Sequence, residues 1–557
     1  MNQRFLTTLG GRASSVLRAS SRSKIISSST AAVYLHRCKS STSTHEEATV
    51  DLTTSQAHIN RYWKQVTGDT GDPAYIPEKT LPDMSNIPPT EDGIRELLLK
   101  AITAKADQGD LVPSLLTQQA IDFYRTLEIP MKAVYLRVLA REFGVDKKHA
   151  LEAAIEFTKS GTMSDRSAVR AEEVFKSALV APYQRFFQQV IQLGGGMSWL
   201  VSLRADVLGL LAEDNDPWLH AIDGYLKHQL SSWFGVGFLD LERLTWNSPA
   251  SVLEKVIAYE AVHEIKSWTP HLKQRLSQGR LCYAFFHRAI PLLPLAFVQI
   301  ALVDKISSSV QTILNDASPN SDPTHHKTAI FYSITSTQRG LSGVDLGNFL
   351  IKRVVVEIKK HIPTVDTFCT LSPIPGFRKW LSTQMNQEIG SGARGGLLEA
   401  SEVSRLVGAS GSALDAVKKL NELVSTHDWV KDKSLEELLK PLLLRLCSRY
   451  LLLEKKRSFC LDPVGNFHIR NGASIHRLNW MGDTQVKGLV QSFGIMTNYN
   501  YIVPEIEANN QRYMHDGIIA VVSTAEGIHP TLQWAVEQSG RKVKIVSLSA
   551  PSTSPHL

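Results

Sequence analysis

One segment, residues 328–360, restricts the fold more than any other because its hydrophobic period changes along it. Thr328 to Ile334 is rich in β-branched and aromatic residues and predicts a strand. A loop marked by three glycines follows. After the loop, apolar residues recur at helical spacing and predict a helix ending at Lys360: Leu346, Phe349, Leu350, Val354 and Ile358.

The glycine loop between this strand and helix is a candidate anion site. Free N–H groups at a helix start point at a bound phosphate, and the helix dipole adds to the attraction. Glycine lets the backbone approach closely and adopt positive φ. The spacing of Gly340, Gly343 and Gly347 matches neither a P-loop nor the GxGxxG pattern, so an ordinary strand–helix connection remains the alternative.

Length and composition predict a globular protein of two or three domains. The chain has 557 residues, 43% hydrophobic and 21% charged. The net charge of +7 is small for this length, and no basic stripe with interleaved aromatics stands out, so we expect no nucleic-acid partner. The longest apolar run, Ala289 to Val303, contains two prolines and is too short to span a bilayer.

Cysteine spacing favours free thiols. The chain contains no CxxC pair, which argues against a zinc ribbon or a dense disulfide framework and suits a reducing compartment. An intersubunit disulfide remains the alternative to five free thiols, which are Cys38, Cys282, Cys369, Cys447 and Cys460.

Residues 1–45 have the composition of an organellar transit peptide, with seven basic residues, many serines and no Asp or Glu. A disordered basic tail is the alternative, and composition does not separate mitochondrion from plastid. The C-terminal Pro555-His556-Leu557 departs from the peroxisomal Ser-Lys-Leu pattern at two positions. Residues 46–90 are polar and proline-rich, and we expect a disordered linker.

Residues 91–229 carry apolar stripes at helical spacing and predict a helical bundle for assembly. Ile94, Leu97, Leu98 and Ile102 form one such stripe. Strand-like segments begin after about residue 230, including Leu281 to Phe286, Ala296 to Leu302 and Val365 to Leu371. The second half is therefore predicted to be α/β or α+β with an antiparallel part, and helix formers around 386–440 predict a helical insertion.

Residues 467–480 predict a β-hairpin. Phe467 to Arg470 and Ala473 to Trp480 flank Asn471-Gly472, the dipeptide that favours a two-residue type I′ turn. In that register strand alternation places five side chains on one polar face, namely Asn466, His468, Arg470, Ile475 and Arg477.

Several motifs, in order, closely resemble the malonyl-CoA decarboxylase family: GFLDLERLTWNSP (237–249), YEAVHEIKSW (259–268), FYSITSTQRGLSGVDLGNFLIKRVV (331–355), LSPIPGFRKWL (371–381) and DPVGNFHIRNGASIHRLNWMGD (462–483). The resemblance implies an α+β protein, with an N-terminal all-helical bundle domain followed by a GNAT-like mixed-sheet acyl-CoA domain over residues 230–557. It also implies a homo-oligomer, dimer or tetramer, through the helical domain, with no metal or organic cofactor.

The resemblance assigns roles to particular residues. Ser372 and His468 match the family's catalytic serine and histidine, and Tyr501 matches a tyrosine at its pocket; His263 and Arg477 lie in matching motifs without an assigned role. The family's acyl-CoA-binding loop falls on Ser342, Gly343, Val344, Asp345, Leu346, Gly347 and Asn348. Because a carboxylate beside a pyrophosphate would repel it, we expect Asp345 to point away and cap the following helix.

The implied activity is decarboxylation of malonyl-CoA to acetyl-CoA and CO₂ through an enolate, linked to fatty acid metabolism in the mitochondrial matrix, with a peroxisomal or plastid location as alternatives. The reaction needs an oxyanion stabilised and a carbon protonated, and histidine suits the second task. A GNAT-type acyltransferase and a non-catalytic CoA-binding scaffold are the alternatives.

Overall fold

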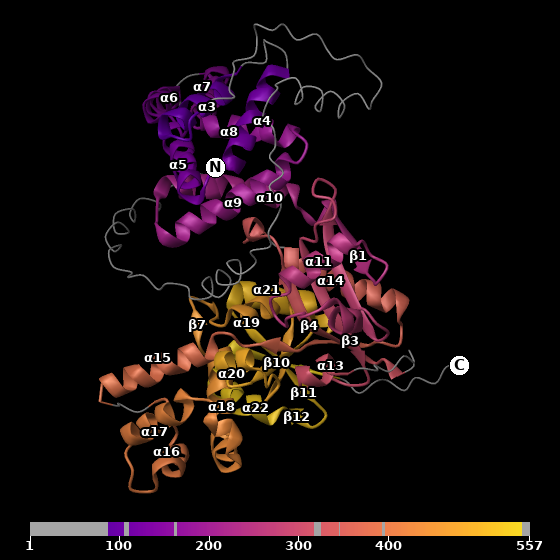
Figure 1. Ribbon diagram of the computed structural model, residues 1–557. Helices are drawn as coiled ribbons and strands as arrows, with labels where there is room; N and C mark the ends of the chain where they lie inside the picture. The colour runs from indigo at the N-terminus through magenta and orange to yellow at the C-terminus, as the bar shows by residue number, and fades with distance from the viewer. Residues whose placement is uncertain are drawn as a thin grey trace, which may run out of the picture. The chain divides into compact units, whose positions relative to one another are not determined.

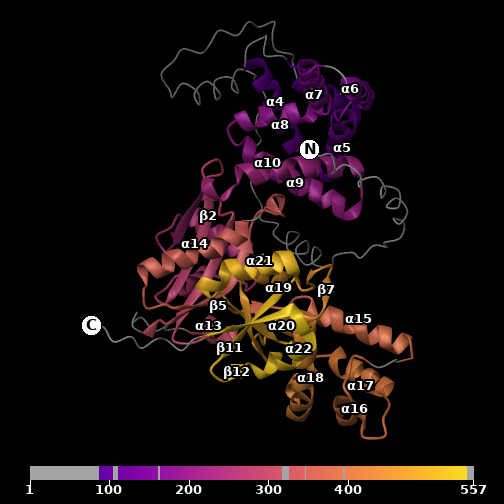
Figure 2. The same cartoon turned by 180° about the vertical axis from the view of Figure 1, so that it is seen from behind.

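The computed structural model describes residues 87–104, 111–160, 164–316, 325–344, 346–392 and 396–548, without the side chains of Leu111 and Asn348. The segment expected to be a transit peptide and most of the expected linker lie outside these residues, as does Asp345. Figures 1 and 2 show the chain from opposite sides.

The first half of the described chain is helical, as predicted (Figure 1). Its stripes turn inward: Ile94, Leu97 and Leu98 are buried, and Tyr124 and Phe186 pack edge-on against Trp199. The helices are α3 (Glu91–Thr103), α4 (Leu111–Thr126), α5 (Ile129–Glu142), α6 (Lys147–Ser160), α7 (Asp165–Ala178), α8 (Pro182–Gln192), α9 (Gly196–Glu213) and α10 (Pro217–Trp233).

The second half is built on a mixed sheet in the order β1-β2-β3-β4-β5-β10-β9-β11-β12, with β13 paired to β11 and β6 to β10. Strands β1 to β4 are antiparallel, and β4 and β5 are parallel. The strands are β1 (Leu239–Leu244), β2 (Arg280–His287), β3 (Ala296–Val303), β4 (Thr328–Ser336), β5 (Thr367–Thr370), β6 (Ser372–Pro373), β9 (Ser474–Asn479), β10 (Met496–Asn500), β11 (Ile519–Thr524), β12 (Gly527–Ile528) and β13 (Val543–Ser547).

The expected helical region followed by a mixed-sheet region is therefore correct, as are the predicted strands at 281–286, 296–302, 328–334 and 365–371. The segment of residues 328–360, with which the sequence analysis began, folds as predicted. It forms β4, a short 3₁₀ turn η5 (Arg339–Leu341) and then α14 (Leu346–His361), which packs against β2, β3 and β4 (Figure 2). Five other short turns accompany the sheet: η2 (Val236–Phe238), η3 (Trp268–Leu272), η6 (Asp428–Lys431), η7 (Val503–Glu505) and η8 (Gly540–Lys542).

The parallel strands β4 and β5 separate at their C-terminal ends. Their pairing runs from Thr328 opposite Thr367 to Phe331 opposite Thr370. Beyond that point β4 continues beside β3 alone, whereas the chain after β5 moves to β10, where Ser372 pairs with Thr497. The sheet thus divides next to Ser372.

The remaining helices surround this sheet, and those between β6 and β7 fill the region around 386–440, with α17 packed on both α15 and α16 (Figure 1). A separate two-stranded ribbon comprises β7 (Lys455–Lys456) and β8 (Phe459–Cys460). The helices are α11 (Ala250–Tyr259), α12 (Lys273–Arg275), α13 (Val310–Leu314), α15 (Phe377–Gly390), α16 (Ala400–Val407), α17 (Ala413–Ser425), α18 (Lys433–Leu452), α19 (Pro463–Arg470), α20 (Val486–Ser492), α21 (Ile506–Asp516) and α22 (Pro530–Ser539).

The predicted hairpin over residues 467–480 is wrong in its first half. Residues 463–470 form helix α19, and only Ser474–Asn479 is a strand, β9. Helix-capping signals prevail over the β-propensity of the sequence: the side chain of Asp462 accepts from Gly465 N, Pro463 opens the helix, and Gly472 has φ +83° just after it. The predicted polar face therefore does not exist. Its residues Asn466, His468 and Arg470 lie on the helix, and Ile475 and Arg477 lie on β9.

The four cysteines in the described part of the chain, Cys282, Cys369, Cys447 and Cys460, are free and buried, while Cys38 lies outside it. Burial raises the pKa of the Cys369 thiol to about 12 and that of Cys460 to about 12. Of the helices described here, none has the length and apolar character that a membrane span requires.

Candidate active site

The structure brings together three residues that the sequence places far apart: Ser372, His468 and Tyr501. Ser372 Oγ lies 3.0 Å from His468 Nε2, and Tyr501 Oη lies 2.8 Å from His468 Nδ1. Ser372 comes from β6 where the sheet divides, His468 comes from α19, and Tyr501 directly follows β10. All three are buried, with exposed fractions of 5%, 2% and 1%.

The hydrogen bonds at Ser372 fix the direction of the proton chain. Ser372 has a single hydroxyl proton, which it donates to Thr370 Oγ1 at 2.9 Å. It follows that His468 Nε2–H donates to Ser372 Oγ, and that Nδ1 accepts from the Tyr501 hydroxyl. The resting histidine is thus a donor toward the serine.

Burial keeps this site uncharged. It lowers the pKa of His468 to about 3, and no charged neighbour contributes to that shift. Burial likewise raises the pKa of Tyr501 well above its ordinary value. At neutral pH the site therefore offers neutral hydrogen-bond donors in a low-dielectric setting, where each one has a larger electrostatic effect than in water.

Residues that sequence reasoning missed hold the histidine in place. The ring of Tyr499 stacks on that of His468 with centroids 4.6 Å apart, and Phe467 packs edge-on against it. Thr370 Oγ1 accepts from Ser372 and from Tyr499 N at 3.1 Å. Strand alternation could have found both, because Thr370 and Tyr499 stand two residues before Ser372 and Tyr501.

The helix that carries His468 is anchored at its start by Asp462. This carboxylate is fully buried and accepts from Gly465 N at 2.8 Å and from the Tyr450 hydroxyl at 3.3 Å. Burial raises the pKa of Asp462 to about 6, against the opposing effect of these hydrogen bonds. The Asp-Pro pair at 462–463 is the sequence signal that would have located the cap.

The predicted acyl-CoA loop, residues 342–348, lies at the start of α14. Gly343 has φ +77°, which favours glycine. Ser342 is exposed, Leu346 is buried, and Val344 packs against the core. The first amides of α14, at Gly347 and Asn348, have no partner within the helix, as at any helix N-terminus.

Two close contacts fix where this loop lies. A Cβ added to Gly347 would come 2.9 Å from the ring of Phe467, so the start of α14 packs on the helix that carries His468. On its other side the buried guanidinium of Arg204, from α9, donates to Gly340 O at 2.6 Å and Ser342 O at 3.0 Å. The loop is thus held between α19 and the helical region.

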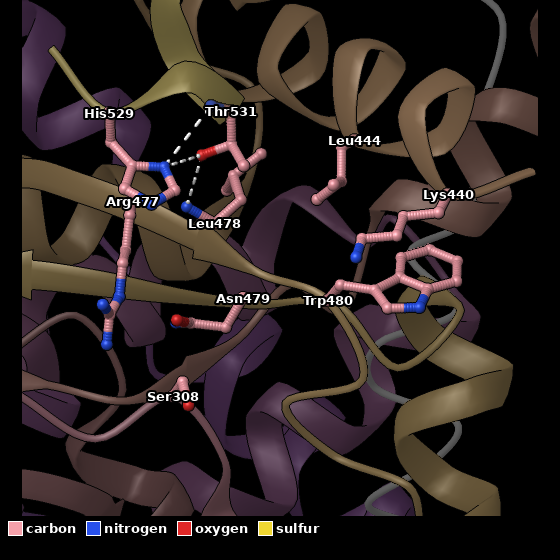
Figure 3. A pocket seen from close by; sticks show the side chains of 9 residues that line it. All are labelled: Ser308, Lys440, Leu444, Arg477, Leu478, Asn479, Trp480, His529 and Thr531. Carbon is pink, nitrogen blue, oxygen red and sulfur yellow. Dashed lines mark hydrogen bonds between the residues drawn. The ribbon is translucent and has the colours of Figure 1, made fainter. Parts of the chain in front are cut away.

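His263 and Arg477 do not join the Ser372–His468 pair. His263 is buried beside Tyr332 and Arg275, and burial, reinforced by the positive charges of Arg275 and Lys487, lowers its pKa to about 3. Arg477 donates to Asn498 Oδ1 and Ile306 O. It lines a cavity of about 260 Å³, and Figure 3 shows its side chain there below His529.

This cavity is built from β9, α18 and the segment before α22, and its lining includes Ser308, Lys440, Leu444, Asn479 and Trp480. It contains neither Ser372 nor His468. Asn498, which Arg477 contacts, also donates to Thr370 O at 2.7 Å. Arg477 therefore contacts the framework of β5 and β10 and does not lie on the polar face that the sequence predicted. It also lines a second cavity, of about 500 Å³, together with Tyr501.

Within the residues that the structure describes, no three His, Cys, Asp or Glu side chains lie close enough together to hold a metal ion. Fold and site together define a two-part protein, in which a helical region precedes a mixed-sheet domain with a buried Ser–His–Tyr chain at the division of its sheet.

Comparison with known proteins identifies the family. The family model described as malonyl-CoA decarboxylase C-terminal domain matches residues 237–540, and the one described as its N-terminal domain matches residues 143–234. The chain belongs to the malonyl-CoA decarboxylase family.

Curated relatives and solved structures agree with this assignment. Mitochondrial malonyl-CoA decarboxylase of Anser anser anser is 40% identical over 404 residues, which are 71% of this chain and 79% of the relative. That of Rattus norvegicus is 39% identical over 437 residues, 76% and 88% of the two chains. The crystal structure of malonyl-CoA decarboxylase from Rhodopseudomonas palustris superposes with a TM-score of 0.69 at 34% identity, covering 78% of this chain and 98% of that one. The Agrobacterium vitis structure gives 0.65 at 30% identity, covering 79% and 98%.

Proposed function

We propose that this chain is a carboxy-lyase that converts malonyl-CoA to acetyl-CoA and CO₂, with Ser372 and His468 as its catalytic residues. Membership of the family supports the activity. The observation that carries the assignment of residues is the buried hydrogen-bond chain from Tyr501 through His468 to Ser372.

The reaction breaks the bond between C2 and the carboxylate carbon of the malonyl group. The electron pair of that bond passes to the thioester as an enolate, CO₂ departs, and a proton replaces it on C2. Preorganised donors to the developing oxyanion are commonly the largest catalytic contribution, roughly 3–4 kcal/mol for one donor. The Nε2–H of His468 is such a donor, already aimed at the site and requiring no ionisation.

In this proposal His468 either donates a hydrogen bond to the thioester oxygen as the enolate forms or passes its Nε2 proton to C2. In the second case Nδ1 takes up the Tyr501 hydroxyl proton in the same step, so the imidazole stays neutral, and solvent reprotonates the tyrosine. Tyr501 holds the ring in the tautomer that presents Nε2–H. General acid catalysis of this kind adds about 10²–10⁴-fold to a rate.

Ser372 holds the malonyl carboxylate through its hydroxyl, which turns from Thr370 to the substrate. In the structure as described, the hydrogen bonds of Ser372 and His468 are to uncharged groups only. This suits the chemistry, because a buried arginine–carboxylate pair would stabilise the ground-state carboxylate that has to be lost.

Residues 342–348 hold the phosphates of CoA in the same proposal. The amides of Gly347 and Asn348 in the first turn of α14 supply donors. The packing of Gly347 on Phe467 places this part of the ligand next to the helix of His468. Asp345 is the one residue of the loop that the chemistry does not need. We propose that Asp345 caps α14 and points away from the phosphates.

The acyltransferase alternative needs His468 to act as a base that activates an acceptor amine. A histidine whose pKa lies near 3 is a poor base at neutral pH, so the site favours decarboxylation. The test is CO₂ and acetyl-CoA release from malonyl-CoA by protein lacking residues 1–45, with no amine present. Release of free CoA that requires an added amine would overturn the proposal, and tight binding of malonyl-CoA without turnover would instead indicate a scaffold.

We also propose a homo-oligomer, a dimer or tetramer, assembled through the helical domain of residues 91–229. The pair α6–α7 supports this, because it exposes apolar side chains that a monomer would leave in water, among them Leu151, Ile155, Val169 and Val174. Light scattering of the Leu151→Glu/Val169→Glu double variant tests it, and a mass unchanged from wild type would exclude this face.

We further propose that the protein acts in the mitochondrial matrix, as the names of its relatives suggest, with residues 1–45 as the transit peptide. The remaining proposed boundaries are a linker at 46–90 and a catalytic domain at 230–557. Fusing residues 1–45 to a fluorescent protein tests the address; uptake by plastids or peroxisomes instead would contradict it.

A further inference from the structure

One lysine of the helical region lies against the predicted CoA loop. Lys227 is on α10, and a Cβ added to Gly343 would lie 3.0 Å from its Cε and 3.1 Å from its Nζ. The aliphatic end of Lys227 and its ammonium group therefore rest on the loop at its positive-φ glycine. No larger residue would fit at position 343 without displacing that side chain.

The charge of Lys227 is not used by the protein itself. Asp223 lies one turn earlier on the same helix, the i,i+4 spacing at which a carboxylate ordinarily pairs with a lysine. That carboxylate is taken by Arg204, whose Nε lies 2.8 Å from Asp223 Oδ1. Among the residues that the structure describes, Lys227 forms no ion pair, and it is exposed.

Arg204 at the same time makes the loop a better place for an anion. Its Nη1 donates to the carbonyl oxygens of Gly340 and Ser342, which would otherwise present partial negative charge. The guanidinium is almost fully buried, with an exposed fraction of 2%, and its partner Asp223 fixes it. The loop backbone also touches α9 directly, since a Cβ on Gly340 would meet Val201 O at 1.8 Å.

We propose that the helical region completes the CoA-binding site, with Lys227 as a phosphate-binding residue and Arg204 as the positioning residue for the loop. This inference rests on the proposed function, because it takes residues 342–348 as the loop that holds CoA. It adds that the ligand is held by the helical region as well as by the mixed-sheet domain. An ammonium group at this place adds a point charge to the backbone donors of α14.

The test is the steady-state kinetics of Lys227→Gln in the full chain with three substrates. These are malonyl-CoA, malonyl-dephospho-CoA, which lacks the 3′-phosphate, and malonyl-pantetheine, which lacks all the nucleotide phosphates. We expect KM for malonyl-CoA to rise about tenfold with kcat within twofold of wild type, the effect of losing one hydrogen bond to a charged group. KM for malonyl-pantetheine should not change.

The dephospho substrate identifies the phosphate. If Lys227→Gln raises its KM as much as that of malonyl-CoA, the lysine binds the diphosphate; if not, it binds the 3′-phosphate. Lys148→Gln, at an exposed position of α6, is the matched control and should behave as wild type. Lys227→Arg should retain most of the affinity.

An unchanged KM for malonyl-CoA in Lys227→Gln would overturn the proposal, as would an equal rise for malonyl-pantetheine. A wild-type protein that releases no CO₂ from any of the three substrates contradicts the proposed function instead. Equilibrium binding of CoA to Lys227→Gln and to the Lys148→Gln control then still tests the role of Lys227.

Discussion

The two ends of the proposed ligand site differ in the kind of group that the protein presents. Around Ser372 and His468 the side chains are buried and neutral, and burial holds the pKa of the histidine near 3. At the loop before α14 the groups are the backbone amides of the helix start, a lysine that forms no ion pair with any described residue, and an arginine that donates to carbonyl oxygens of the loop. Decarboxylation explains the contrast. A cation at the first place would stabilise the carboxylate that must leave, whereas a cation at the second place would bind phosphates that do not react.

Removing the neutral donor at the reacting end, His468, is expected to have the largest effect on activity. We expect His468→Ala to lower kcat for malonyl-CoA by about 10³-fold, within the range for loss of an oxyanion donor that also transfers a proton. KM should change less than threefold, because the phosphates are bound elsewhere. Lys148→Gln, an exposed substitution away from the site, controls for effects of expression and purification on kcat. Activity within tenfold of wild type would remove His468 from the mechanism.

Ser372→Ala tests how the carboxylate is held. The substitution adds no bulk to β6 and removes the hydroxyl that faces His468 Nε2. We expect kcat to fall by about 10²-fold, since a misoriented carboxylate departs less readily. Thr370→Val removes the oxygen that accepts from the Ser372 hydroxyl, and we expect it to lower kcat less than Ser372→Ala does. A Ser372→Ala enzyme with wild-type kcat would contradict the assignment.

Tyr501→Phe tests the orientation of the imidazole without touching the substrate. Its hydroxyl is the donor to His468 Nδ1, and losing one such bond is worth roughly 1.4 kcal/mol, or about tenfold in kcat. A positioning role further predicts that the imidazole tautomers mix, which ¹⁵N chemical shifts of His468 report. If the shifts stay those of a pure Nε2–H tautomer, Tyr501 does not set the tautomer.

The smallest expected effect concerns stability and pH. The pKa of His468 is about 3 in the folded protein and about 6.5 in the unfolded chain. As pH falls below 6.5 the unfolded chain takes up a proton that the folded site does not, so folding stability is lost towards pH 3. His468→Gln should therefore lose less Tm than wild type between pH 7.5 and pH 5. Parallel Tm curves would mean that His468 is not held neutral by burial.

The elements whose apolar residues follow one clear period, that of a strand or that of a helix, were predictable from the sequence. Residues 328–360 fold as strand, loop and helix because their apolar pattern changes from the strand period to the helical one. The helix α19 was not predicted, since Phe467, His468 and Ile469 favour a strand by composition. The caps at Asp462 and Gly472 decide the local fold against that preference.

The partners within the site were harder to predict than the elements. Family resemblance pointed to Ser372, His468 and Tyr501, yet the stacking of Tyr499 and the acceptor role of Thr370 appear only in three dimensions. Arg204 and Gly340 are 136 residues apart, and nothing local in either segment indicates their contact. Hydrogen bonds of that range depend on how whole elements pack, which periodicity does not encode.

The salt dependence of CO₂ release by the wild-type protein tests the central claim most directly. Salt screens exposed charges strongly and buried neutral groups hardly at all. Between about 0.02 and 0.5 M salt we predict that KM for malonyl-CoA rises several-fold, that KM for malonyl-pantetheine stays constant, and that kcat is unchanged for both substrates. A kcat that falls steeply with salt, or a KM for malonyl-CoA that ignores it, would contradict a neutral reacting end joined to a charged phosphate end.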